Sequence, residues 1–134
     1  MKRVLFLCTN NSARSQMAEG LLRHLYGDSY EVFSAGTEPT QVHPSTIAVM
    51  KERGIDISNQ KAKSLDPYIK EDFDYVVTVC DRAREACPFF AGGKEMLHQN
   101  FMDPAQASST KDEILSTFRL VRDEIEAWLK QIFS

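Results

Sequence analysis

A cysteine and an arginine six positions apart, Cys8 and Arg14, carry the clearest chemical signal in this sequence. The apolar run at residues 4–7 predicts a buried strand that ends at Cys8. A cysteine thiolate is a strong nucleophile, and a guanidinium is a planar, two-pronged donor that fits a tetrahedral oxyanion. The pair therefore indicates a nucleophile coupled to an anion site.

The stretch that joins the two residues lies between this strand and a predicted helix. A helix over about residues 15–26 is indicated by apolar residues spaced i, i+3, i+4 and i+7, namely Ala18, Leu21, Leu22 and Leu25. Backbone N–H groups and the positive end of the helix dipole favour an anion at such a point. The anion-binding set that we expect is Thr9, Asn10, Asn11, Ser12, Ala13, Arg14 and Ser15.

The same positive field should lower the pKa of the Cys8 thiol, so we expect a thiolate at neutral pH. The alternative for a cysteine at the end of a buried strand is a small core residue with no chemistry. The arginine at fixed spacing and the helix that follows argue for the nucleophile.

The chain as a whole predicts a single domain spanning residues 1–134. Its 43% hydrophobic and 26% charged residues are typical of a globular protein, and its net charge of −3 argues against a nucleic-acid surface. The N-terminal apolar run is too short for a signal peptide, and no segment reaches transmembrane length. Three cysteines without a secretory signal indicate a reducing compartment. We therefore expect a cytoplasmic protein without membrane contact, and a monomer.

Predicted strands alternate with predicted helices along the chain. The strands fall at about residues 3–8, 31–36, 75–80 and 96–101, and a helix from Pro44 ends near Gly54. A long helix follows the capping-box pattern at Thr110 and Glu113. Its apolar stripe comprises Ile114, Phe118, Val121, Ile125, Trp128 and Ile132. Alternation of this kind predicts an α/β fold with a parallel sheet covered on both faces.

Ligands of such sheets bind outside the carboxyl ends of the strands. Cys8 and Cys80 both end predicted strands, so they could lie at the same edge of the sheet. Cys80 and Cys87 could be incidental thiols, zinc ligands, or members of a relay in which each thiolate attacks the preceding disulfide. A zinc site is the weakest of these alternatives, because the spacing fits no common zinc pattern. Asp103 precedes a proline and is either a turn residue or a carboxyl that protonates a leaving oxygen.

These residues resemble the arsenate reductases built on the low-molecular-weight tyrosine phosphatase fold. The resemblance covers nearly the whole chain, in the segments 8–20, 34–36, 54–60, 76–80, 87–88, 103–105 and 121–125. It implies a flavodoxin-like three-layer sandwich with a four-stranded parallel sheet. Gln16 stands where phosphatases of this fold usually have proline, and Ala105 and Gln106 stand where they place aromatic residues to hold a phenyl ring.

The resemblance implies arsenate reduction to arsenite without a cofactor. Cys8 attacks arsenic in the loop, Arg14 holds the oxyanion, and Asp103 protonates the departing oxygen. Cys80 and Cys87 complete the thiol relay, which thioredoxin, or a glutaredoxin-type partner, regenerates. Two alternatives stay open at this point: a phosphatase acting on small or peptidyl phosphates, and a non-catalytic redox sensor that binds oxyanions or arsenite.

The potassium site of some relatives maps onto Asn11, Glu19 and Ser34, with an acidic residue where this chain has Lys63. A lysine at that position suggests that its ammonium group replaces the ion. The alternative is a lysine that faces solvent.

Overall fold

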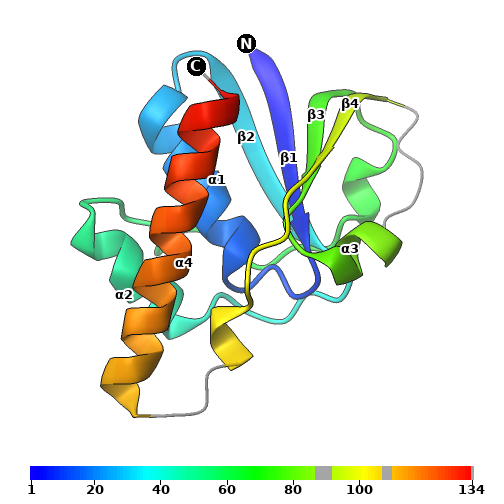
Figure 1. The fold of residues 1–134 in the computed structure, drawn as a ribbon. Helices are drawn as coiled ribbons and strands as arrows, with labels where there is room; N and C mark the ends of the chain where they lie inside the picture. Colours follow the sequence, from blue (N-terminus) through cyan, green and yellow to red (C-terminus); the bar gives the residue numbers. More distant parts are fainter. Residues whose placement is uncertain (87–91, 107–109, 134) are drawn as a thin grey trace.

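The computed structural model describes residues 1–86, 92–106 and 110–133. Four parallel strands form one sheet in the order β2-β1-β3-β4. They are β1 (Lys2–Cys8), β2 (Tyr30–Gly36), β3 (Phe73–Thr78) and β4 (Gly93–His98). Figure 1 shows α1 (Arg14–Tyr26), α2 (Pro44–Glu52) and α4 (Lys111–Ile132) on one face of the sheet, and α3 (Asp81–Ala86) on the other. The expected three-layer α/β fold is confirmed.

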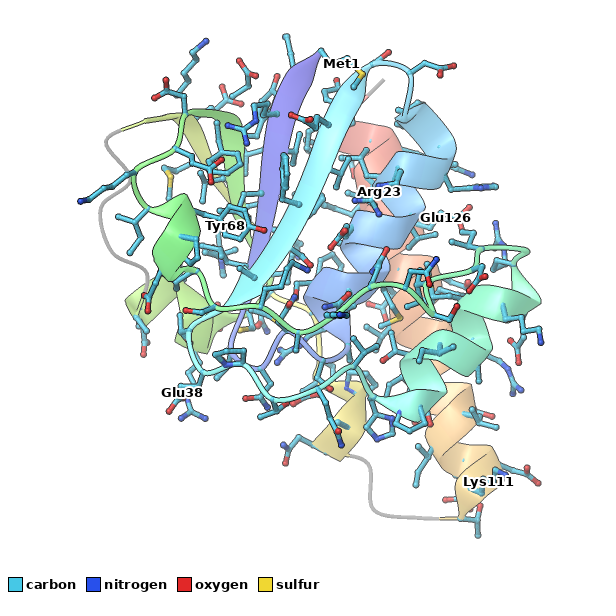
Figure 2. All side chains as sticks on the ribbon, turned by 180° about the vertical axis from the view of Figure 1, so that it is seen from behind. Met1, Arg23, Glu38, Tyr68, Lys111 and Glu126 are labelled. Atoms are coloured by element: carbon cyan, nitrogen blue, oxygen red, sulfur yellow. The ribbon has the colours of Figure 1, made fainter. Side chains whose placement is uncertain are left out.

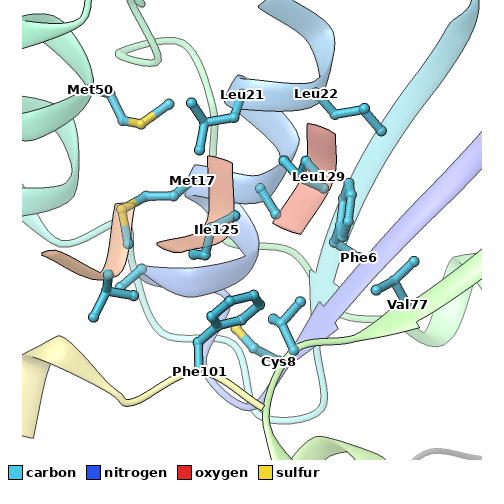
Figure 3. Close-up of a cluster of buried hydrophobic side chains, with 14 of the residues drawn as sticks. Phe6, Cys8, Met17, Leu21, Leu22, Met50, Val77, Phe101, Ile125 and Leu129 are labelled. Carbon is cyan, nitrogen blue, oxygen red and sulfur yellow. The ribbon is translucent and has the colours of Figure 1, made fainter. Parts of the chain in front are cut away.

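The alternation of side chains along the strands divides the core into two clusters. The larger cluster includes Phe6, Val77 and Ile125, and it lies between the sheet and the helices α1 and α4 (Figure 3). The smaller cluster includes Leu5 and Leu7 on the opposite face, where the short 3₁₀ segment Asp66–Tyr68 covers it (Figure 2). Because side chains point alternately to the two faces, both faces of β1 are buried.

Strand boundaries differ from the prediction at the functional edge. β3 ends at Thr78, so Cys80 lies two residues beyond the strand and directly before α3. β4 spans residues 93–98 and not 96–101, because Gly93 already pairs with Phe73 in the sheet. The residues after His98 leave the sheet and lead to Asp103 at the same edge.

The helix ends follow their capping residues. Thr110 caps α4 by accepting a hydrogen bond from the Glu113 amide at 3.3 Å, as the capping-box pattern predicts. His43 caps α2 through its ring nitrogen, which accepts from the Ser45 amide. The expected apolar stripe of α4 is wrong at one end, because Ile132 is 44% exposed whereas Leu129 is fully buried.

Candidate active site

The Cys8 thiol lies at the end of β1, and two donors approach its sulfur. The backbone amide of Asn11 donates to Cys8 Sγ at 3.1 Å, and Ser15 Oγ lies 2.8 Å from the same atom. Ser15 Oγ also accepts a hydrogen bond from Asn11 Nδ2 at 2.7 Å. A hydroxyl has a single proton, so Ser15 is free to donate that proton to the sulfur.

Burial nevertheless raises the pKa of the Cys8 thiol. The side chain is almost fully enclosed, which disfavours the charged thiolate. The hydrogen bond from Ser15 and the charge of Arg14 act in the opposite direction, but burial outweighs them. The expected lowering of the Cys8 pKa is therefore wrong for this arrangement.

The backbone of the loop turns at Asn11 so that an amide points to the Cys8 sulfur. Asn11 adopts a left-handed conformation, with φ of 50°, which asparagine tolerates better than most residues. This turn aims its amide at the Cys8 sulfur. Gln16 donates through Nε2 to the Asn11 carbonyl, the Asn11 side chain and the Lys61 carbonyl, so it fixes the turn from within the fold.

The start of α1 and the second strand complete the loop. Ala13 occupies the N-cap position and offers no side-chain acceptor to the first amides of α1. Ser12 contributes its carbonyl oxygen, which accepts from the His43 amide and from Thr46 Oγ1. A side chain at Gly36 would meet the Thr9 carbonyl at 2.6 Å, so only glycine lets β2 approach the loop this closely.

Arg14 and Asp103 meet at the rim of the loop. Arg14 donates to the Phe101 carbonyl at 3.0 Å, and a second guanidinium nitrogen lies 3.6 Å from an Asp103 carboxylate oxygen. The two side chains are 12% and 23% exposed, so both are accessible from outside. The role of the Phe101 backbone could not be predicted from sequence, because any residue has a carbonyl group.

Cys80 reaches the same edge from the segment between β3 and α3, and β3 is the neighbour of β1 in the sheet. Its sulfur lies 3.5 Å from Thr9 Oγ1, and the Ala83 amide in the first turn of α3 donates to it at 3.3 Å. Thr9 directly follows Cys8, so one loop residue links the surroundings of both cysteines. Cys8 and Cys80 thus lie at the same edge of the sheet, as expected, although Cys80 follows its strand and does not end it. Cys87 lies outside the described residues.

A cavity of about 270 Å³ opens at this edge. It is lined by Thr9, Asn10, Arg14, Cys80, Asp81, Arg82, Asn100, Asp103 and Gln106. This volume accommodates a tetrahedral oxyanion with room to spare, and the lining carries both a fixed cation and a second thiol. Cys8 is not among the lining residues, and only 2% of its surface is exposed.

Lys63 lies beside the buried carboxylate of Glu19. Its ammonium nitrogen is 3.7 Å from Glu19 Oε1, and Arg23 pairs with the other carboxylate oxygen at 2.6 Å. Ser34 donates to Glu19, and the Lys63 amide donates to the Asn11 side chain at 2.9 Å. Among the residues that the structure describes, no group of three or more His, Cys, Asp or Glu could hold a metal ion.

The chain matches the family described as low molecular weight phosphotyrosine protein phosphatase over residues 3–134. It belongs to this family. The four-stranded parallel sheet with its helices matches the fold of this family.

Within this family the chain is similar to arsenate reductases. One from Halalkalibacterium halodurans is 46% identical over 129 residues, which are 96% of this chain and 93% of the relative. One from Bacillus subtilis is 45% identical over 130 residues, 97% of this chain and 94% of the relative. A solved structure of an arsenate reductase in the phosphate binding state is 34% identical, with a TM-score of 0.85, and the match covers 98% of this chain and 96% of that one.

No helix in the described part of the chain is both long and apolar enough to span a membrane.

Proposed function

We propose that this protein is an arsenate reductase that uses its own thiols as the source of electrons. One observation carries the proposal: Cys8, at the end of β1, and Cys80, just after β3, lie at the same edge of the sheet. Thr9, the neighbour of Cys8, contacts the Cys80 sulfur and lines the same cavity as Cys80. A phosphatase needs the loop cysteine alone. A reductase needs a second thiol within reach of it, because reduction of arsenic consumes two electrons. The full-length similarity to arsenate reductases supports the same function.

Arsenate binds to the loop through backbone N–H groups and the Arg14 guanidinium. A guanidinium has five N–H donors, and Arg14 spends one of them on the Phe101 carbonyl. Because burial raises the pKa of Cys8, the thiol proton leaves as the substrate binds, and an arsenate oxygen is the base that accepts it. The hydrogen bonds from Ser15 and Asn11 then hold the thiolate.

In the first chemical step the Cys8 sulfur attacks arsenic. A sulfur–arsenic bond forms and an arsenic–oxygen bond breaks. Asp103 donates a proton to the departing oxygen, which leaves as water. Without substrate, an Asp103 carboxylate oxygen lies 3.6 Å from Arg14. When arsenate takes this place on the guanidinium, the Asp103 carboxylate binds a proton from solvent, because the neighbouring anion favours its neutral form. This is the proton that it gives to the departing oxygen.

In the second step the Cys80 thiolate attacks the Cys8 sulfur. A Cys8–Cys80 disulfide forms, the sulfur–arsenic bond breaks, and its electron pair stays on arsenic. Arsenic is thereby reduced from the +5 to the +3 state while two thiols are oxidised to a disulfide. Protons from solvent complete the arsenite that leaves.

Cys87 then attacks Cys80, which frees Cys8 and moves the disulfide to Cys80 and Cys87. An external dithiol of the thioredoxin or glutaredoxin type reduces this bond. Only Ala83 of the helix between the two cysteines is buried, so few apolar contacts oppose its rearrangement. Chemistry of this kind requires a reducing compartment, and we propose the cytoplasm.

The lining of the cavity supports an inorganic substrate. Gln106 lines it, and the neighbouring Ala105 is an exposed small residue. Neither offers an aromatic face against which a phenyl ring could stack. A small oxyanion needs no such wall.

Lys63 is proposed to replace a bound cation. Its ammonium group pairs with Glu19, and its backbone amide holds Asn11, which in turn aims at Cys8. Together with Arg23, Lys63 thus supplies positive charge beside the buried Glu19 carboxylate from within the chain.

A coupled assay tests the function. Thioredoxin, thioredoxin reductase and NADPH are supplied with arsenate, and hydrolysis of an aryl phosphate is measured alongside. We expect arsenate-dependent NADPH consumption over many turnovers, its loss in Cys80→Ser, and no loss in Arg84→Ala, an exposed residue of α3. Aryl phosphate hydrolysis without arsenate-dependent NADPH consumption would instead establish a phosphatase.

A further inference from the structure

The imidazole of His98 bridges the end of the sheet and the start of α3. His98 is the last residue of β4 and pairs in register with Thr78, the last residue of β3. Its Nδ1 lies 2.7 Å from Thr78 Oγ1, and its Nε2 lies 2.7 Å from an Asp81 carboxylate oxygen. The His98 side chain is 18% exposed and that of Asp81 is 67% exposed, so the ring is held in the fold while its contact with Asp81 lies at the surface.

A second contact holds the same residue of α3. The backbone amide of Asp81 donates to Asn100 Oδ1 at 3.0 Å. Asp81 is thus held by its side chain through His98 and by its backbone through Asn100. Both partners come from the end of β4 and the segment that follows it.

Asp81 directly follows Cys80 in the chain. The first turn of α3 also supplies the Ala83 amide, which donates to the Cys80 sulfur at 3.3 Å. A movement of Asp81 away from His98 would therefore shift Cys80 and the amide that contacts it. The position of the Cys80 sulfur therefore depends on the hydrogen bond between His98 and Asp81, although the thiol takes no part in that bond.

We propose that His98 is a positioning residue for the second thiol of the reaction, acting through Asp81 to hold Cys80 against Thr9 and within reach of Cys8. The proposal rests on the reductase function proposed above. His98 touches neither cysteine in the described contacts, and its effect is confined to the step in which Cys80 attacks.

A neutral imidazole is sufficient for both hydrogen bonds of His98, the one to Asp81 and the one to Thr78. A neutral imidazole with its proton on Nε2 donates to the Asp81 carboxylate and accepts from the Thr78 hydroxyl at Nδ1. Alanine at position 98 removes both bonds. Asparagine at position 81 keeps an oxygen acceptor where the carboxylate lies.

The test isolates the second step in a Cys87→Ser background, where the relay stops at the Cys8–Cys80 disulfide. Reduced protein is mixed with arsenate without external reductant, quenched at intervals and analysed by mass spectrometry. The variants are His98→Ala, Asp81→Ala and Asp81→Asn, with Arg84→Ala as the exposed control on the same helix. Alkylation of Cys8 by iodoacetamide and hydrogen exchange of residues 81–86 are measured on each variant.

We expect His98→Ala and Asp81→Ala to slow disulfide formation by about two- to ten-fold, the range that one net hydrogen bond supports. Arg84→Ala should match the parent rate, and Asp81→Asn, which keeps the acceptor oxygen, should form the disulfide faster than Asp81→Ala. Cys8 alkylation should be unchanged in all variants, because it does not depend on α3. Exchange of residues 81–86 should quicken only in the two slow variants.

Three results would overturn the proposal. The first is disulfide formation at the parent rate in His98→Ala. The second is an Asp81→Asn variant as slow as Asp81→Ala. The third is a loss of Cys8 alkylation in the slow variants, which would indicate general disruption of the site. If the parent itself forms no disulfide with arsenate, the reductase function fails. Hydrogen exchange then still shows whether His98 holds the first turn of α3.

Discussion

Removal of the Ser15 hydroxyl should make Cys8 a much weaker nucleophile. Ser15 Oγ accepts from Asn11 and so donates its single proton to the Cys8 sulfur at 2.8 Å. This hydrogen bond is one of the influences that lower the pKa of Cys8 against the larger effect of burial. Ser15→Ala removes the largest influence that opposes burial and leaves only the smaller effects of the Ser15 backbone and the Arg14 charge. The pKa of the Cys8 thiol should therefore rise further.

The size of the effect follows from the energy of a hydrogen bond to a charged group. Such a bond contributes about 1.5–3 kcal/mol, and one pKa unit corresponds to about 1.4 kcal/mol. The pKa of Cys8 should therefore rise by about one to two units. At neutral pH, below the pKa of both proteins, the thiolate population and the alkylation rate should fall by about 10- to 100-fold.

The assay is the pH dependence of Cys8 alkylation by iodoacetamide, followed by mass spectrometry in a Cys80→Ser, Cys87→Ser background. Because the pKa is raised by burial, the rate in the parent should still be rising as pH increases past the ordinary value for a thiol. Ser58→Ala, a serine replaced on an exposed segment, is the matched control. Equal rates at neutral pH in Ser15→Ala and the parent would refute the assigned direction of this hydrogen bond.

Three further predictions concern other parts of the chain. Asp103→Asn should leave oxyanion binding intact and slow the first chemical step by about 10²–10⁴-fold; single-turnover reduction at the parent rate would make Asp103 a turn residue only. Potassium and sodium at fixed ionic strength should support equal activity, because the Lys63 ammonium already pairs with Glu19, and a large activation specific to potassium would contradict this role. Ile125→Ala, which empties a fully buried position, should lower the free energy of unfolding in urea by about 2–5 kcal/mol, whereas Ile132→Ala, at an exposed position, should change it by less than about 0.5 kcal/mol.

Much of the fold could be predicted from local pattern. The apolar run before Cys8, the capping residue Thr110 and the alternation of strands with helices led to the parallel sheet and to the edge where both cysteines lie. These features are local, because a strand, a helix start or a cap depends on residues a few positions apart. The ends of β3 and β4 were misplaced by two or three residues, since pairing between strands, and not propensity, decides where a strand stops.

The protonation of Cys8 and the partners of the rim residues were decided by the tertiary structure alone. The sequence predicts the positive charge near the thiol, but only packing determines how completely water is excluded, and burial reverses the expected direction of the pKa shift. Likewise, Arg14 meets the Phe101 carbonyl, and His98 meets Asp81, across 87 and 17 positions of chain. Such contacts leave no periodic signature in the sequence, because they depend on which strand ends the sheet brings side by side.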